Sequence, residues 1–212
     1  MKQRKRWVWI NPVAAQMSDP DVLARELART GFIRVTARED HAAAIRQFYR
    51  KMVTDLRLGG KCAGDIRCPA AVQMVRRLFP DAPIIFPDTD PILIRTAAEL
   101  AGRLAAEGQE IEELQIVTPC QALCALGEKK AFPRTRFLTW KAFQQENDLQ
   151  VPQKRLLASP VPLDFFRGCA EKVVSLEPWE KIEKWFQNGA VSGTDLAELL
   201  YCPGGCIGGD GI

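Results

Sequence analysis

Histidine is almost absent from this chain of 212 residues, in which His41 is the single example. A catalytic centre or metal site built on several histidines is therefore excluded. His41 lies in EDHAAAIRQFYRKM, where apolar residues recur at helical spacing. We expect it to begin that helix or to lie on its surface rather than to take part in chemistry.

Long hydrophobic runs are also missing. No apolar stretch approaches the roughly 18 residues of a membrane-spanning helix. The apolar run Trp7–Ile10 is interrupted by Asn11 and Pro12, and is too short for the core of a signal peptide. Charge is balanced, with 29 Lys and Arg against 26 Asp and Glu, and only the start at Lys2–Arg6 is markedly basic. The composition therefore favours neither a membrane nor a nucleic acid as partner.

Short β-like runs alternate with helical stretches along the chain, which indicates parallel α/β units. The helix expected over Asp19–Gly31 has Asp19 as N-cap, Pro20 in its first position and Gly31 as its stop. The proline-containing stretch Asp148–Pro162 is the best candidate for a crossing between two lobes. We expect strands at residues 6–12, 32–37, 83–86, 114–119, 136–140 and 173–176, and helices at 19–31, from 41, from 69, at 90–108 and at 178–189.

Cysteine is the informative residue type, because seven cysteines occur in a chain that we do not expect to be exported. An odd number in a chain of this size disfavours a disulfide scaffold and favours metal, cluster or redox chemistry. The C-x-x-C pairs that are usual in zinc sites are absent. The cysteines are Cys62, Cys68, Cys120, Cys124, Cys169, Cys202 and Cys206.

Four of these cysteines have a local context that suits ligation. Cys68 precedes Pro69 at a predicted helix start, where the helix dipole favours a thiolate. Cys120 follows LQIVTP at the carboxyl end of a predicted strand, where sites form in parallel sheets. The chain ends in YCPGGCIGGDGI, in which Cys202 and Cys206 lie among five glycines. Four thiolates from three segments suit a four-iron cube or a zinc ion.

Three signatures carry a resemblance to the catalytic domain of iron-only ([FeFe]) hydrogenases. ELLYCPGGCIGG resembles the third signature of that family, and VTPCQALC resembles the second. CPAAVQMVRRLFP resembles the first, in its version with one cysteine before the proline. INPVAA, FLTWKAF and KIEKWFQNGAVSGTDLAELLYC resemble the segments around them, so the similarity covers nearly the whole chain in a shortened form.

The resemblance implies an H-cluster, which is a [4Fe-4S] cube joined to a diiron unit that carries CO and cyanide. Cys206 would bridge the cube and the diiron unit and be the catalytic residue of a minimal hydrogenase that interconverts H2 with protons and electrons. The implied fold has two α/β lobes of short, mostly parallel sheets flanked by helices, with the cluster in the cleft between them. Lobe one would cover about residues 1–80 with the C-terminal segment, and lobe two about 81–190. The implied ligands of the cube are Cys68, Cys120, Cys202 and Cys206.

The resemblance also implies partners and a location. The chain lacks ferredoxin-like cysteine clusters, so electrons would come from a ferredoxin-like carrier or a redox partner subunit. The basic start, together with Lys61 and Arg67 beside the first ligand region, could attract an acidic carrier, although for each of these residues alone we expect a solvated surface charge. Hydrogenase maturation factors would be needed for assembly, and the cytoplasm of an anaerobe is the implied compartment.

Two positions depart from the family pattern. Arg67 stands where the most active members have a second cysteine that relays protons. Leu123 stands where the second signature usually has a lysine that holds a cyanide ligand, and an apolar side chain cannot donate that hydrogen bond. Lys129 or Lys130 could replace the lysine, and Cys62 could replace the thiol. Fast proton delivery and retention of the diiron unit therefore both depend on these substitutes.

Three carboxylates near the signatures, Asp65, Glu128 and Asp210, could carry protons, but we expect ordinary surface or loop residues. We likewise expect Cys62 and Cys169 to be core cysteines. Three functions stay open: a minimal hydrogenase, a non-catalytic [4Fe-4S] protein in electron transfer or in redox or H2 sensing, and a zinc-stabilised or thiol-redox interaction protein.

Overall fold

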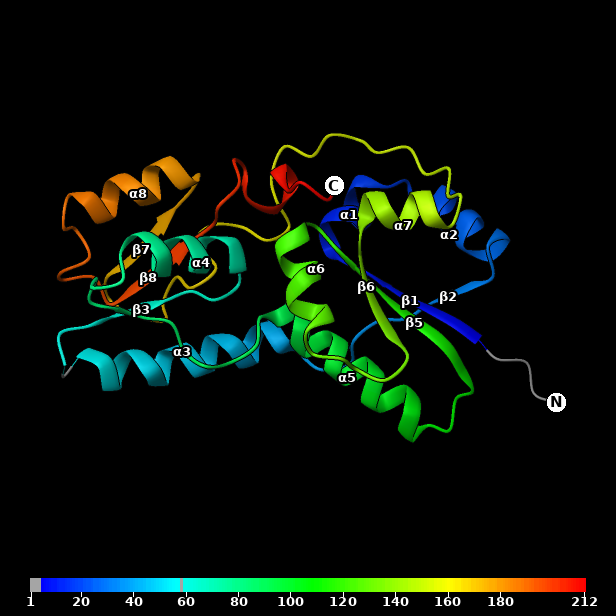
Figure 1. Cartoon of the computed structure of the whole chain (residues 1–212), viewed down its shortest axis with the longest axis horizontal. Coiled ribbons are helices and arrows are strands. Elements are labelled where there is room, and N and C mark those ends of the chain that lie inside the picture. The colour runs from blue at the N-terminus through cyan, green and yellow to red at the C-terminus, as the bar shows by residue number, and fades with distance from the viewer. Residues whose placement is uncertain (1–4, 58) are drawn as a thin grey trace. The chain divides into compact units, whose positions relative to one another are not determined.

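The computed structural model describes residues 5–57 and 59–212 and has two compact units, each with a four-stranded, all-parallel sheet flanked by helices (Figure 1). The predicted α/β class with short parallel sheets is confirmed. Unit 1 comprises the residues up to Glu39, Leu93–Pro160 and Gly209–Ile212, and unit 2 comprises Asp40–Ile92 and Val161–Gly208.

The sheet of unit 1 has the order β2-β1-β5-β6. Its strands are β1 (Lys5–Ile10), β2 (Phe32–Arg34), β5 (Ile111–Thr118) and β6 (Thr135–Thr139). The helices of this unit are α1 (Pro12–Met17), α2 (Pro20–Arg29), α5 (Ile92–Ala106), α6 (Gln121–Glu128) and α7 (Trp140–Glu146). The register aligns Thr118 with Thr139, so β5 and β6 end side by side.

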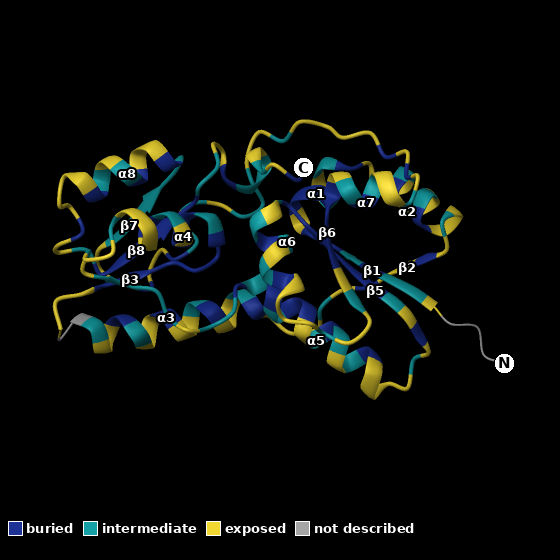
Figure 2. Cartoon of the chain, viewed as in Figure 1, coloured by how far each residue is buried: buried dark blue, intermediate teal, exposed yellow. Residues whose placement is uncertain are grey.

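Burial on both faces of the central strands holds unit 1 together (Figure 2). Ile116 of β5 packs into one apolar cluster and its neighbour Val117 into another, and both side chains have no exposed surface. Successive side chains of a strand point to opposite faces, so both faces of this sheet are covered. The run LQIVTP, which predicted a strand here, supplies apolar side chains to both faces.

The sheet of unit 2 has the order β4-β3-β8-β7. Its strands are β3 (Cys62–Gly64), β4 (Ile84–Ile85), β7 (Val173–Leu176) and β8 (Leu196–Leu199). The helices are α3 (His41–Arg57), α4 (Pro69–Leu78) and α8 (Trp179–Gln187), and a 3-10 turn η1 covers Gly205–Gly208. The two central strands, β3 and β8, were not predicted, because CAG and LAEL lack strand-forming residues.

Helix starts follow the predicted chemistry. Asp19 caps α2, and its Oδ1 accepts the N–H groups of Asp21 and Val22, both at 3.0 Å. Cys68 is the N-cap residue of α4, as its position before Pro69 predicted. His41 is the first residue of α3, in accord with the expected helix start, although it is buried.

The residues that make up each unit differ from those expected for the two lobes, which were about 1–80 with the C-terminal segment and about 81–190. The chain passes between the units after Glu39, Ile92, Pro160 and Gly208. The third passage lies within Asp148–Pro162, the stretch expected to cross between lobes. Parallel strands are joined by long connections, so distant segments add strands to the same sheet, and a single cut in the sequence cannot describe that arrangement. In the described part of the chain, none of the helices combines the length and the apolarity needed to cross a bilayer.

Candidate functional site

Cys68 lies where the chain turns from β3 into α4. Its Sγ accepts a hydrogen bond from the N–H of Tyr201 at 3.5 Å. Burial raises the pKa of the Cys68 thiol, and hydrogen bonds from the backbone of Ala71, Tyr201 and Ala70 act in the opposite direction. The N–H of Tyr201 is thus directed at this sulfur, as N–H groups are at cluster ligands in iron–sulfur proteins.

Cys202 and Cys206 lie in the loop that follows β8. Because Tyr201 directly precedes Cys202, its bond to Cys68 brings the first and third signatures together within unit 2. Gly204 and Gly205 have φ of +71° and +68°, a region that favours glycine. The loop folds tightly on itself, since a Cβ on Gly208 would lie 2.2 Å from the carbonyl oxygen of Pro203.

Cys120 follows the carboxyl end of β5, as predicted, and is also the N-cap residue of α6, a helix that was not predicted. Its side chain does not make the cap hydrogen bond of that helix. The N–H of Gln121 instead donates to Oδ1 of Asp210 at 2.9 Å. The expected loop position of Asp210 is met, but its carboxylate has a defined structural role.

The donor set fits iron–sulfur ligation in its chemistry. All four candidate sulfurs are half-buried cysteines, and none of the chain's seven cysteines forms a disulfide. Cys68, Cys202 and Cys206 belong to unit 2, and Cys120 belongs to unit 1. Among residues 5–57 and 59–212, no group of three or more His, Cys, Asp or Glu side chains is arranged to hold a metal ion. The three candidates of unit 2 therefore do not make a single-ion site by themselves.

Arg67 is held in a buried ion network. Its Nε lies 2.9 Å from Oδ2 of Asp65, and its Nη2 pairs with Oε1 of Glu198. The guanidinium also lies over Phe165, 4.2 Å from the ring centroid. The Glu198 carboxylate accepts a further hydrogen bond from the hydroxyl of Ser175 at 2.7 Å. Arg67 is thus a core residue of unit 2. The suggestion that it attracts an acidic carrier is wrong, because its charge is buried and paired.

The same network corrects the expectation for Asp65. We expected an ordinary surface or loop residue; Asp65 does lie in the loop after β3, but it has no exposed surface. Burial raises the pKa of Asp65 to about 6, and the charge of Arg67 opposes that shift. Loss of hydration is the main cost of ionising Asp65, and the negative charge of the neighbouring Glu198 adds to it.

Leu123 packs in the apolar core of unit 1, in the same cluster as Ile94 and Phe137. The proposed substitutes Lys129 and Lys130 are exposed and follow the last residue of α6. Cys120 is at the other end of this helix, which is about 12 Å long. From the far end of α6, neither lysine therefore takes the place of the hydrogen-bond donor that Leu123 lacks.

The remaining cysteines have structural surroundings. Cys62 and Cys169 are buried, which confirms the expectation of core cysteines, and burial raises the pKa of Cys62 to about 12. Cys124 donates from Sγ to the carbonyl oxygen of Phe137 at 3.1 Å. Glu128 is exposed, as expected, and its carboxylate accepts the N–H of Phe137.

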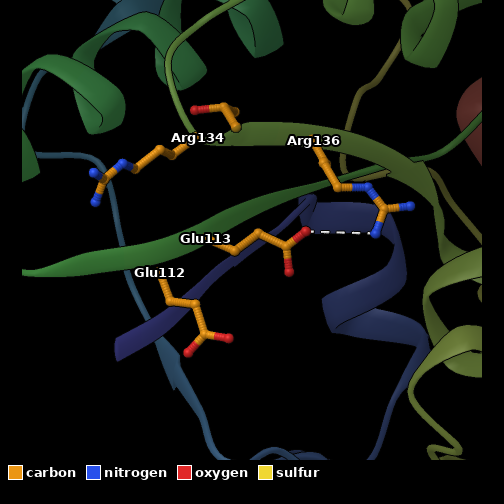
Figure 3. Close-up of a pocket in the computed structure, with 5 residues that line it drawn as sticks. Glu112, Glu113, Arg134 and Arg136 are labelled. Atoms are coloured by element: carbon orange, nitrogen blue, oxygen red, sulfur yellow. Dashed lines mark hydrogen bonds and ion pairs between the residues drawn. The ribbon is translucent and has the colours of Figure 1, made fainter. Parts of the chain in front are cut away.

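A surface pocket of about 440 Å³ in unit 1 lies away from Cys120. Figure 3 shows Arg136 paired with Glu113 at 3.4 Å, while Arg134 and Glu112 lie apart from that pair. Glu113 precedes the carboxyl end of β5 by five residues, which is about 17 Å along a strand. The charged side chains of this pocket can attract solvent ions, but the lining of the pocket contains no cysteine. The pocket is lined by Glu112, Glu113, Arg134, Thr135 and Arg136.

Sequence reasoning missed Glu198, the second carboxylate on Arg67. It lies in LAEL of β8, is the first residue of the quoted stretch ELLYCPGGCIGG, and is fully buried. A charged residue inside an otherwise apolar tetrapeptide was the available signal, because buried charges are kept only with a partner.

No family model matches the chain, and no curated protein sequence matches it.

Proposed function

We propose that this chain is an iron–sulfur protein that holds a [4Fe-4S] cube through Cys68, Cys120, Cys202 and Cys206. The observation that carries the proposal is the hydrogen bond from the N–H of Tyr201 to Sγ of Cys68. It joins two of the three cysteine segments through a sulfur acceptor, and a third segment places Cys120 at a helix start. The resemblance of all three signatures to the iron-only hydrogenases supports the same set of ligands.

The residues around these sulfurs suit a redox cluster. When bound, a four-iron cube supplies one-electron transfer. Burial raises the pKa of Cys68, and the N–H of Tyr201 opposes that shift by donating to the sulfur, as it would to a thiolate that ligates iron. The glycines after Cys202 let the backbone approach a bulky group without a side chain in the way.

Electron transfer or redox sensing is the use that the geometry supports best. In the family pattern, the positions of Arg67 and Leu123 relay protons and hold a cyanide ligand. Here Arg67 is engaged with two buried carboxylates, and Leu123 is in an apolar core. Both side chains have structural roles, so this chain lacks the parts that fast H2 turnover requires in the family.

A minimal hydrogenase is the second candidate. Cys206 favours it, because this half-buried cysteine lies in the glycine-rich turn η1 and occupies the position of the ligand that bridges to the diiron unit in the family. Infrared spectroscopy after anaerobic co-expression with hydrogenase maturation factors separates the two candidates. Bands of metal-bound CO and cyanide that disappear in Cys206→Ala support the hydrogenase, and iron and sulfide without such bands support the cube alone.

Replacement of single cysteines tests the ligand set. We expect Cys68→Ser, Cys120→Ser, Cys202→Ser and Cys206→Ser each to lose most of the iron and acid-labile sulfide after anaerobic purification. Cys124→Ser is the matched control, since Cys124 is half-buried on the same helix as Cys120 but bonds to a carbonyl oxygen. Equal loss in Cys124→Ser, or zinc in place of iron in the unaltered protein, would contradict the proposal.

A further inference from the structure

The segment Gly209–Ile212 is fixed to unit 1 by backbone hydrogen bonds. The N–H of Gly211 donates to the carbonyl oxygen of Pro119 at 3.2 Å, and its own carbonyl oxygen accepts the N–H of Lys141 at 3.0 Å. Nζ of Lys141 also donates to the carbonyl oxygen of Asp210 at 3.2 Å. The segment therefore joins the start of α6 to the start of α7.

Asp210 performs the capping that Cys120 does not. An N-cap side chain normally accepts an N–H group from the first turn of its own helix. In α6, Cys120 makes no such bond, and the Gln121 N–H donates to the carboxylate of Asp210. A carboxylate at this end also suits the positive pole of the helix.

Gly211 shows how closely the segment lies against Cys120. A Cβ at this buried glycine would be 2.7 Å from Cβ of Thr139 and 3.1 Å from Cα of Cys120. The backbone of the segment thus occupies the space beside Cys120 that a side chain would otherwise fill. Movement of residues 210–211 would change the surroundings of Cys120 directly.

The same segment is continuous with the third signature. Three residues separate Cys206 from Asp210. A fully extended chain covers about 14 Å over this distance at most. Asp210 is therefore joined to Cys206 by only a short stretch of chain.

We propose that residues 209–212 form a clip that positions Cys120 for the cluster, with Asp210 as the positioning residue. This inference rests on the proposed function, because it assigns a role to Asp210 through a proposed ligand. The carboxylate fixes the first turn of α6, and Gly211 fixes the backbone beside Cys120. Asn at position 210 can accept the same N–H group, whereas Ala cannot.

The test uses the cluster-loaded full chain and compares Asp210→Ala with Asp210→Asn. We expect Asp210→Ala to release iron to a chelator about fivefold faster, which corresponds to the typical loss of an N-cap. Asp210→Asn should release iron at nearly the unaltered rate. Equal rates in Asp210→Ala and the unaltered protein would overturn the proposal.

Alkylation of the iron-free protein distinguishes positioning from general loosening of unit 1. With mass-spectrometric readout, Asp210→Ala should react faster at Cys120 and at an unchanged rate at Cys124, one helical turn further along α6. Equal acceleration at both cysteines, or none at Cys120, would overturn the clip. If the unaltered protein binds no iron at all, the proposed function fails, and alkylation alone then decides whether the clip fixes Cys120.

Discussion

Arg67 shows how one residue can be read in two ways. From the sequence it is a departure from a hydrogenase-like pattern, at a position where a thiol would relay protons. In the structure its guanidinium neutralises part of the charge of Asp65 and Glu198, and the side chain is 4% exposed. Replacement of Arg67 is thus expected to change the stability of unit 2, because it removes the partner of both carboxylates.

We expect Arg67→Cys, which restores the thiol of the family pattern, to lower the free energy of unfolding by about 3–5 kcal/mol, because two buried carboxylates lose their cation. Urea unfolding of the iron-free protein measures this. Arg77→Cys is the control, since Arg77 is exposed on α4, and exposed positions usually change stability by less than about 0.5 kcal/mol. A loss below about 1 kcal/mol in Arg67→Cys would show that the pairing contributes little.

At the scale of elements, α6 packs closely against β6 because the helix has a glycine at the point of contact. Gly127 is buried in this helix, and a Cβ there would be 2.1 Å from Cδ1 of Phe137 on β6. The helix can therefore approach the strand closely at this point. The close approach also suits the bond between Cys124 and the Phe137 carbonyl oxygen.

Glycine is unfavourable within a helix, so Gly→Ala ordinarily stabilises by about 1 kcal/mol. We expect the opposite sign for Gly127→Ala, with a loss of about 1–3 kcal/mol because the Phe137 ring must move. Gly102→Ala in α5 is the matched control, because no atom lies within 4 Å of its added Cβ, and it should stabilise the protein. Thermal unfolding of the two variants checks both signs, and a stabilised Gly127→Ala would contradict the tight packing.

For the whole molecule, each unit is assembled from segments that are distant in sequence. The sheet of unit 2 pairs Ala63 of β3 with Leu196 of β8. In the sequence, the segment Leu93–Pro160 of unit 1 lies between these two residues. The connection around Lys154–Leu157 is exposed at Lys154 and Arg155, and Leu157 has its full surface exposed. Exposed loops of this kind are preferred sites of proteolysis.

We expect limited trypsin digestion to cut after Lys154 or Arg155 and leave the two fragments associated. The C-terminal fragment carries β7 and β8, and β8 pairs with β3 in the N-terminal fragment. The fragments should elute together in gel filtration and separate only in denaturant. Separation without denaturant would mean that the shared sheet does not hold the fragments together.

Part of the candidate site was predictable from local sequence alone. Pro69 after Cys68 correctly placed that cysteine at a helix start, and the run LQIVTP correctly placed Cys120 at the end of a strand, because both features depend on neighbouring residues. The surroundings of those cysteines were not predictable in this way. Asp210 reaches Gln121 across 89 positions of sequence, and no local pattern encodes that pairing.

The sequence by itself determined the α/β class, most of the elements and the four candidate ligands, since these follow from periodicity, caps and signatures. Only the tertiary structure decided the central strands β3 and β8, whose short sequences become strands because both neighbours pair with them. It also decided that Arg67 and Asp65 are buried together with Glu198. Burial and long-range pairing depend on which distant segments meet, and that is set by the packing of the whole chain rather than by any one stretch of it.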